Sequence, residues 1–242
     1  LEYGFTHINN IRVNEFGTPI LIDAFSTVKQ LSEDSTLIYT NADIIFTSDL
    51  LKLRKSITQS RFMAVGRRVD LDITEPIYYK DFNWEKKLHD LTASRGKLHG
   101  YAGIDYFLFP KSLNISMPDF PVGRPGWDNW LLYDMKLKNV PIIDVTPMSL
   151  VIHPNHSSIY RKPDKKIEVQ KSYELANGFK NMITIREADY VLKNNILKLP
   201  SLSRRILGKL AFFYPWQVLL SWKRNLQKKV RSAGHESCHH WG

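Results

Sequence analysis

Short apolar runs that alternate with segments of helical spacing constrain the fold of this chain more than any other feature. The runs are too short for helices and have the length of buried strands; they occupy residues 37–40, 62–65, 104–109, 141–145 and 150–152. Segments with helical character lie between or before them, over residues 20–31, 48–56, 81–93 and 127–138. Strands that alternate with helices predict an α/β fold, with a mixed and mostly parallel sheet flanked by helices.

Polar side chains follow the ends of three of these runs. In chain order they are Asn41 with Asp43, Arg67 with Arg68, and His153. In open α/β sheets, ligands bind at the edge where the strands end. We therefore expect these side chains to contribute to one site at that edge.

The unit Asn41-Ala42-Asp43 ends the apolar run at residues 37–40. A carboxylate in this position can hold a hard divalent cation, directly or through water, and the cation can neutralise the charge on a diphosphate leaving group. Asn41 would then bind a ribose or a metal-bound water. The alternative is that Asp43 only caps the turn that follows.

The segment Trp127-Asp128-Asn129-Trp130 opens the helix expected at residues 127–138. A carboxylate at a helix N-terminus stays ionised beside the helix dipole, so Asp128 is a candidate general base that takes a proton from a hydroxyl. Trp127 and Trp130 fit a wall that stacks on a sugar ring. The alternatives are that Asp128 is a helix N-cap and that the two tryptophans belong to the core.

Two histidines follow the last apolar run, and either His153 or His156 can serve as a further metal ligand. Imidazole suits Mn²⁺ better than Mg²⁺. A histidine in a surface loop is the alternative for each. Arginine forks match phosphate oxygens, so Arg67 or Arg68 is a candidate contact for a diphosphate. We expect the nearby Asp70 to lie in a solvated loop.

The order of these motifs along residues 5–195 resembles that of GT-A glycosyltransferases, here of the family 2-like group that uses nucleotide sugars. Asn41-Ala42-Asp43 resembles their DxD metal motif, and Asp128 stands where inverting members carry the acidic base. The resemblance implies the GT-A fold and Mg²⁺ or Mn²⁺ as the cofactor. It assigns catalysis to Asp128, donor binding to Asn41, Asp43, Arg67 and Arg68, sugar and acceptor binding to Gly103, Asp105, Trp127 and Asn129, and the metal to Asp43 and His153.

The function implied by this resemblance is metal-assisted, inverting transfer of a sugar from a nucleoside-diphosphate sugar to a hydroxyl of a glycan or of a lipid-linked acceptor. One alternative is a non-catalytic carbohydrate-binding or scaffold module derived from such an enzyme. Another is a metal-dependent phosphoesterase that uses Asp43, His153 and His156. Only about forty residues precede Asn41, whereas the resemblance implies a longer nucleotide-binding half. We therefore expect further residues before Leu1 in the native protein.

Basic charge is concentrated near the C-terminus. The net charge is +10, and residues 199–235 contain eight Lys and Arg residues but no Asp or Glu. The rest of the chain is therefore close to neutral, which argues against a uniformly nucleic-acid-binding surface, and we expect no nucleic-acid partner. We predict a glycosyltransferase domain at residues 1–197 and a basic, amphipathic helical extension at residues 198–242.

The extension mixes cations with apolar side chains over residues 199–231. Its apolar part is shorter than a membrane span and contains Pro215, so it can lie on an anionic membrane surface or pack on the domain as a helix pair. The single cysteine, Cys238, cannot form an internal disulfide. Together these features favour a cytoplasmic protein, either free or peripheral on the inner face of the membrane.

Overall fold

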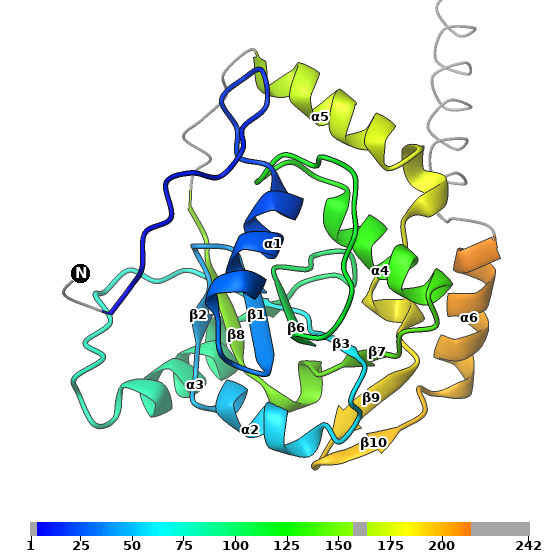
Figure 1. Cartoon of the computed structure of the whole chain (residues 1–242). Coiled ribbons are helices and arrows are strands. Elements are labelled where there is room, and N and C mark those ends of the chain that lie inside the picture. Colours follow the sequence, from blue (N-terminus) through cyan, green and yellow to red (C-terminus); the bar gives the residue numbers. More distant parts are fainter. Residues whose placement is uncertain (1–3, 157–163, 214–242) are drawn as a thin grey trace, which may run out of the picture.

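The computed structural model describes residues 4–156 and 164–213. Two sheets form its centre, and helices surround them (Figure 1). The helices are α1 (Leu21–Leu31), α2 (Asp49–Ser56), α3 (Trp84–Arg95), α4 (Trp127–Leu137), α5 (Asp164–Leu175) and α6 (Leu202–Phe213). Three short 3₁₀ helices, η1 to η3, span Thr146–Met148, Gly178–Asn181 and Ile185–Glu187. The helices expected at residues 20–31, 48–56, 81–93 and 127–138 are confirmed as α1 to α4, with ends that differ by a few residues.

The larger sheet has six strands in the order β1-β6-β3-β7-β9-β10. Their bounds are β1 (Thr36–Thr40), β3 (Met63–Val65), β6 (Tyr106–Pro110), β7 (Ile142–Asp144), β9 (Tyr190–Lys193) and β10 (Ile196–Lys198). β3, β7 and β9 are parallel neighbours, β6 is antiparallel to both β1 and β3, and β10 is antiparallel to β9. β1, β3, β7 and β9 therefore run in one direction. The α/β class, with a mixed sheet flanked by helices, is confirmed.

The smaller sheet has the order β2-β8-β4-β5. Its strands are β2 (Ile45–Phe46), β4 (Val69–Leu71), β5 (Lys97–Leu98) and β8 (Val151–Pro154). β4 and β8 are parallel, whereas the outer strands β2 and β5 are antiparallel to them. In the β4–β8 register, Asp70 lies opposite His153. This pairing brings together two segments that are far apart in the sequence.

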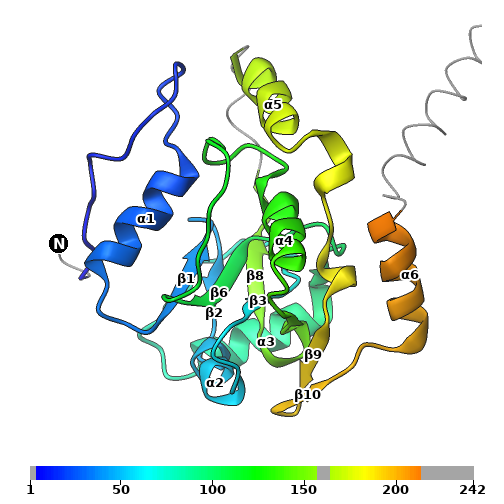
Figure 2. The ribbon, with the colours of Figure 1, turned by 45° about the vertical axis from the view of Figure 1, so that its right-hand side comes forward.

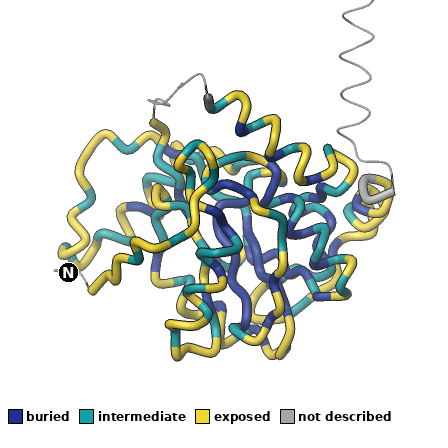
Figure 3. Tube along the Cα trace, turned by 45° about the horizontal axis from the view of Figure 1, so that its top comes forward, coloured by how far each residue is buried: buried dark blue, intermediate teal, exposed yellow. Residues whose placement is uncertain are grey.

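Alternation along the central strands sends side chains to two faces of the larger sheet. On β6, Phe107 and Phe109 pack with α1 and α4, whereas Tyr106 and Leu108 pack with α2. Figure 2 shows α1 and α4 on one side of this sheet, and Figure 3 shows the buried residues gathered along the central strands. The central strands are therefore buried on both faces, as their continuous apolar runs predict.

Strand β1 lies at the edge of the larger sheet. We expected residues 37–40 to form a buried parallel strand, but β1 pairs with β6 alone and is antiparallel to it. Within residues 4–156 and 164–213, no strand pairs with its other edge, and Ile38 is 43% exposed. The expectation was wrong because an apolar run indicates a strand but carries no information about which strand lies alongside.

Helix α6 belongs to the predicted C-terminal extension. It packs against η3, where a Cβ added to Gly208 would lie 3.4 Å from the Cα atom of Glu187. Arg204 Nη1 lies 2.7 Å from Asp144 Oδ2. Residues 214–242 of the extension lie outside the described residues, so a domain boundary near residue 197 stays a prediction. Among the described residues, no helix is both long and apolar enough to cross a membrane.

Candidate functional site

Asp43, His153 and His156 form a cluster of three potential metal ligands. Asp43 Oδ2 lies 3.3 Å from His153 Nε2 and 3.2 Å from His156 Nε2. One ligand atom from each residue lies within 4.8 Å of the ligand atoms of the other two. Asp43 and His156 are 113 residues apart in the sequence, so only the folded chain forms this cluster.

Strand pairing explains how the cluster forms. Asp43 precedes β2, and Ile45 of β2 pairs with Ile152 of β8 in antiparallel register. In such a register, a residue shortly before Ile45 lies beside a residue shortly after Ile152, which is where His153 stands. His156 comes two residues after the end of β8 and reaches the same carboxylate.

One carboxylate oxygen and two imidazole nitrogens form a donor set that fits a divalent cation. This mixed set suits Mn²⁺ better than Mg²⁺, which prefers oxygen ligands. Loss of water contact raises the pKa of Asp43, but the hydrogen bond with His156 and the charge of both histidines outweigh this effect, and its pKa lies below its usual value. Asp43 is therefore ionised at neutral pH, as a metal ligand must be.

Arg68 holds two acidic residues next to this cluster. Its Nη1 donates to Asp105 Oδ2 at 2.6 Å, and its Nε donates to Asp70 Oδ1 at 2.8 Å. Asn41 Nδ2 donates to the other carboxylate oxygen of Asp105 at 2.8 Å. Arg68 therefore balances part of the negative charge at the site, and both oxygens of Asp105 are held in place.

Asp70 connects this network to two histidines. His99 Nδ1 lies 2.6 Å from Asp70 Oδ2, and His153 Nδ1 lies 3.9 Å from Asp70 Oδ1. Loss of water contact raises the pKa of Asp70, but the hydrogen bonds and charges of His99 and Arg68 have the larger effect, so its pKa lies below its usual value. We expected Asp70 to be solvated, but it is half-buried, because the pairing of β4 with β8 places it opposite His153.

Asp128 lies in the first turn of α4, near Asp105 and Tyr39. The residue is half-buried, and its Oδ1 atom is buried without a hydrogen-bond partner in the described part of the chain. Loss of water contact raises its pKa to about 6; Asp105 adds to the increase, and backbone N–H groups at the helix start partly offset it. Burial, together with the charges of Asp128 and Asp105, raises the pKa of Tyr39 to about 12. An acid with a strongly raised pKa beside a charged network is a candidate for acid–base chemistry.

The side chains of Trp127 and Asn129 are buried and make contacts inside the domain. Trp127 is 5% exposed, and its ring centroid lies 4.9 Å from that of Tyr39 and 5.3 Å from that of Phe107. Asn129 is buried, and its Nδ2 donates to the main-chain oxygen of Ile183 at 2.8 Å. Both were expected to contact the substrate. The burial of Trp127 agrees instead with the alternative that it belongs to the core, and both side chains fix α4, which carries Asp128, on the domain.

Arg67 and Gly103 lie around His99. Arg67 Nε donates to the main-chain oxygen of His99 at 2.6 Å, and its guanidinium carbon lies 4.5 Å from the centroid of the Tyr101 ring. A Cβ added to Gly103 would lie 2.3 Å from His99 Cδ2. The Arg67 side chain therefore contacts His99 and Tyr101, and it makes no hydrogen bond to Asp43, Asp70 or Asp105 among the described residues. Gly103 makes room for His99, a residue that sequence reasoning missed because it belongs to no recognisable motif.

Comparison of the chain with protein-family models, with curated proteins and with solved structures gives no match. Fold and side-chain geometry define an α/β protein with a potential metal site, a network of charged side chains beside it, and a carboxyl group of raised pKa that senses the charge of Asp105 in this network. The function is therefore argued from this site.

Proposed function

We propose that this chain is the catalytic part of a metal-dependent glycosyltransferase, which moves a sugar from a nucleoside-diphosphate sugar to a hydroxyl of a glycan or lipid-linked acceptor. One observation carries the proposal: polar residues from five separate segments converge on one site. They are Asn41 with Asp43, Arg68 with Asp70, Asp105, Asp128, and His153 with His156. The site offers a place for a cation and a candidate base, and the reaction needs both.

Asp43, His153 and His156 supply the ligands for the divalent cation. When bound, such a cation neutralises the charge that develops on the departing diphosphate. The two oxygens of Asp105 accept hydrogen bonds from Asn41 and Arg68, and its charge acts on Asp128. A carboxylate that is held in this way has a fixed orientation and can accept hydrogen bonds from sugar hydroxyls.

Asp128 suits the acceptor side of the reaction. A general base is most effective when its pKa lies near the working pH, and the pKa of Asp128 is raised to about 6. At neutral pH this carboxylate is mostly ionised and can take the proton of the acceptor hydroxyl while the hydroxyl oxygen attacks the anomeric carbon. Attack from the side opposite the diphosphate inverts the configuration at that carbon.

The free edge of β1 supports the GT-A assignment. In the GT-A enzymes that the motifs resemble, a nucleotide-binding strand and helix precede the metal motif. β1 leads directly to Asn41 and Asp43, and its outer edge is unpaired in the described part of the chain. The outer edge of β1 thus lies next to the proposed metal ligand Asp43 and is open to a further strand.

A metal-dependent phosphoesterase is the second candidate function. It is favoured by the distances of 3.3 Å and 3.2 Å that join Asp43 to His153 and His156, because these ligands form one cluster in spite of their separation in the sequence. The carbohydrate-binding module has less support, since the Trp127 ring is buried and offers no surface for stacking.

Metal-dependent nucleotide binding is the first test. We would measure the thermal unfolding midpoint with UDP, GDP, CMP and dTDP, each with and without Mn²⁺. A ligand that binds only the folded state adds about 2.7 kcal/mol of stability at about 100 times its Kd. We expect one nucleotide to raise the midpoint only with Mn²⁺, and Asp43→Ala to remove the increase. Asp34→Ala, the control, removes an exposed carboxylate outside the cluster. This variant should show the same Mn²⁺-dependent increase as the unchanged chain.

Absence of a Mn²⁺-dependent increase with every one of these nucleotides would contradict the proposal. Release of sugar 1-phosphate from a nucleotide sugar, which requires cleavage within the diphosphate, would instead identify a phosphoesterase.

A further inference from the structure

Helix α6 turns apolar side chains outward. Leu202, Ile206 and Leu210 recur at four-residue spacing and therefore share one face of the helix; they are 70%, 51% and 55% exposed. Leu207 and Leu199, which precedes the helix, are exposed as well. α6 lies at the outer side of the molecule, beside β9 and β10 (Figure 1). We call Leu202, Ile206 and Leu210 the apolar stripe.

The opposite face of α6 is the one that meets the domain. Gly208 is buried against Glu187. Arg204 pairs with Asp144 at 2.7 Å, and its Nε donates to the main-chain oxygen of Arg186 at 3.1 Å. A helix that packs on a domain and faces water normally turns its apolar side inward and its polar side outward. The reversed orientation of α6 leaves the apolar stripe uncovered in the described part of the chain.

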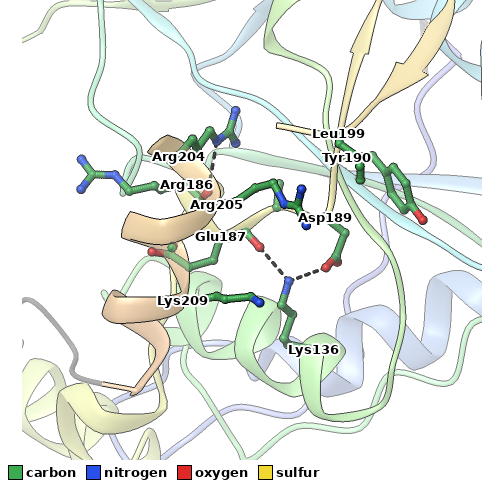
Figure 4. A pocket seen from close by; sticks show the side chains of 11 residues that line it. Lys136, Arg186, Glu187, Asp189, Tyr190, Leu199, Arg204, Arg205 and Lys209 are labelled. Carbon is green, nitrogen blue, oxygen red and sulfur yellow. Dashed lines mark hydrogen bonds and ion pairs between the residues drawn. The ribbon is translucent and has the colours of Figure 1, made fainter. Parts of the chain in front are cut away.

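Cations border the apolar stripe. Arg205 and Lys209 lie on α6, and no hydrogen bond or ion pair within the described residues engages their side chains. Both line a cavity of about 350 Å³ between α4, η3, β9 and α6 (Figure 4). Its charged lining residues are the basic Lys136, Arg186, Arg204, Arg205 and Lys209 and the acidic Glu187 and Asp189. The cavity beside the stripe is therefore predominantly cationic.

The sequence continues this pattern, because residues 199–235 contain eight Lys and Arg residues and no acidic residue. An apolar stripe bordered by cations matches the two components of an anionic bilayer surface. Apolar side chains enter the boundary of the acyl chains, and Lys and Arg meet the lipid phosphates. A partner without negative charge would not account for the complete absence of acidic residues.

We propose that α6 docks the domain on an anionic lipid surface. The apolar stripe lies at the boundary between headgroups and acyl chains, and Arg205 and Lys209 contact lipid phosphates. This docking does not depend on the proposed transferase activity, so each can fail without the other.

Vesicle binding by the full chain tests the proposal. We would measure co-sedimentation with vesicles of phosphatidylcholine alone and with vesicles that also contain phosphatidylglycerol. We expect binding only when phosphatidylglycerol is present, and weaker binding at high salt. Arg205→Gln with Lys209→Gln should weaken binding about 30-fold, or roughly 2 kcal/mol for two cations near an anionic surface.

Matched variants show whether binding depends on the residues of α6 or on any exposed cation or leucine of the protein. Lys55→Gln with Lys97→Gln removes two exposed cations outside α6 and should leave binding nearly unchanged. Leu202→Ser with Ile206→Ser should release the protein from the vesicles. Leu51→Ser with Leu137→Ser removes exposed leucines from α2 and α4 and should not release it. Unfolding midpoints of all variants show whether they remain folded.

Three results would overturn the proposal. The first is absence of binding to phosphatidylglycerol vesicles at low salt, and the second is equal binding by the α6 variants and their controls. The third is a chain that sediments as a dimer and becomes a monomer after Ile206→Ser, because a second copy would then cover the apolar stripe.

Discussion

Asp128 carries a carboxyl group whose pKa is raised to about 6, chiefly because burial removes most of its contact with water. The proposed base must be ionised, so the transfer rate should increase as the pH rises through about 6 and then level off. Asp128→Asn should lower the rate by roughly 10²–10⁴-fold, the usual contribution of a general base, and should preserve nucleotide binding. Asp134→Asn, on the same helix, is the control. Full activity of Asp128→Asn would remove this residue from the mechanism.

Asp128→Asn should also change the free energy of unfolding. The folded protein keeps the proton on Asp128 up to a pH of about 6, whereas the unfolded chain loses it near the usual pKa of 3.8. The free energy of unfolding therefore falls as the pH rises between these values. At pH 7, Asp128→Asn should raise it by on the order of 1–2 kcal/mol, since the residue keeps some contact with water. Urea unfolding should show no difference near pH 4.

At the scale of elements, the start of α4 depends on Gly126. Its φ angle is 101°, and a Cβ at this position would lie 2.8 Å from Met182 Cε. Gly126→Ala should therefore lower the free energy of unfolding by roughly 1–3 kcal/mol. At Gly100 an added Cβ meets nothing within 4 Å, so Gly100→Ala should be nearly neutral. Equal stability of the two variants in urea unfolding would show that the start of α4 tolerates a side chain.

The elements that sequence reasoning missed have identifiable causes. α5 lies among many charged residues and has few apolar side chains, so it shows no clear helical pattern. The hairpin of β9 and β10 had a signal in the sequence. Asn194 and Asn195 join the two strands with φ angles of 53° and 61°, and such a pair between apolar residues is typical of a two-residue hairpin turn.

At the scale of the whole molecule, the unpaired outer edge of β1 predicts a difference in amide exchange across the larger sheet. Amide groups of residues 36–40 that point away from β6 have no strand partner among the described residues, so their hydrogens should exchange rapidly with deuterium in the present chain. Amides of β1 that donate to β6 should exchange more slowly, because they are held in the sheet ladder. The amides of β7, in the centre of the sheet, are the internal reference. Equal protection of the outward amides of β1 and of the amides of β7 would show that the outer edge of β1 is covered.

Only some residues of the candidate site could be predicted from the sequence. Asp43, Asp128 and His153 could be selected because each follows a strand or begins a helix, and such positions lie at the ligand-binding edge of α/β sheets. Asp70 was assigned to a solvated loop, and His99 stands in no motif. Their roles depend on contacts with residues that are distant in the chain.

The sequence by itself determined the α/β class, the positions of four helices and most central strands, and the basic and apolar composition of the C-terminal segment. These properties depend on local spacing and on the chemistry of neighbouring residues, which a sequence contains directly. Only the tertiary structure decided that Asp43 meets His153 and His156, that Trp127 belongs to the core, and that the apolar face of α6 points outward. The physical reason is that strand register and helix orientation depend on how distant segments pack, and local spacing does not specify that packing.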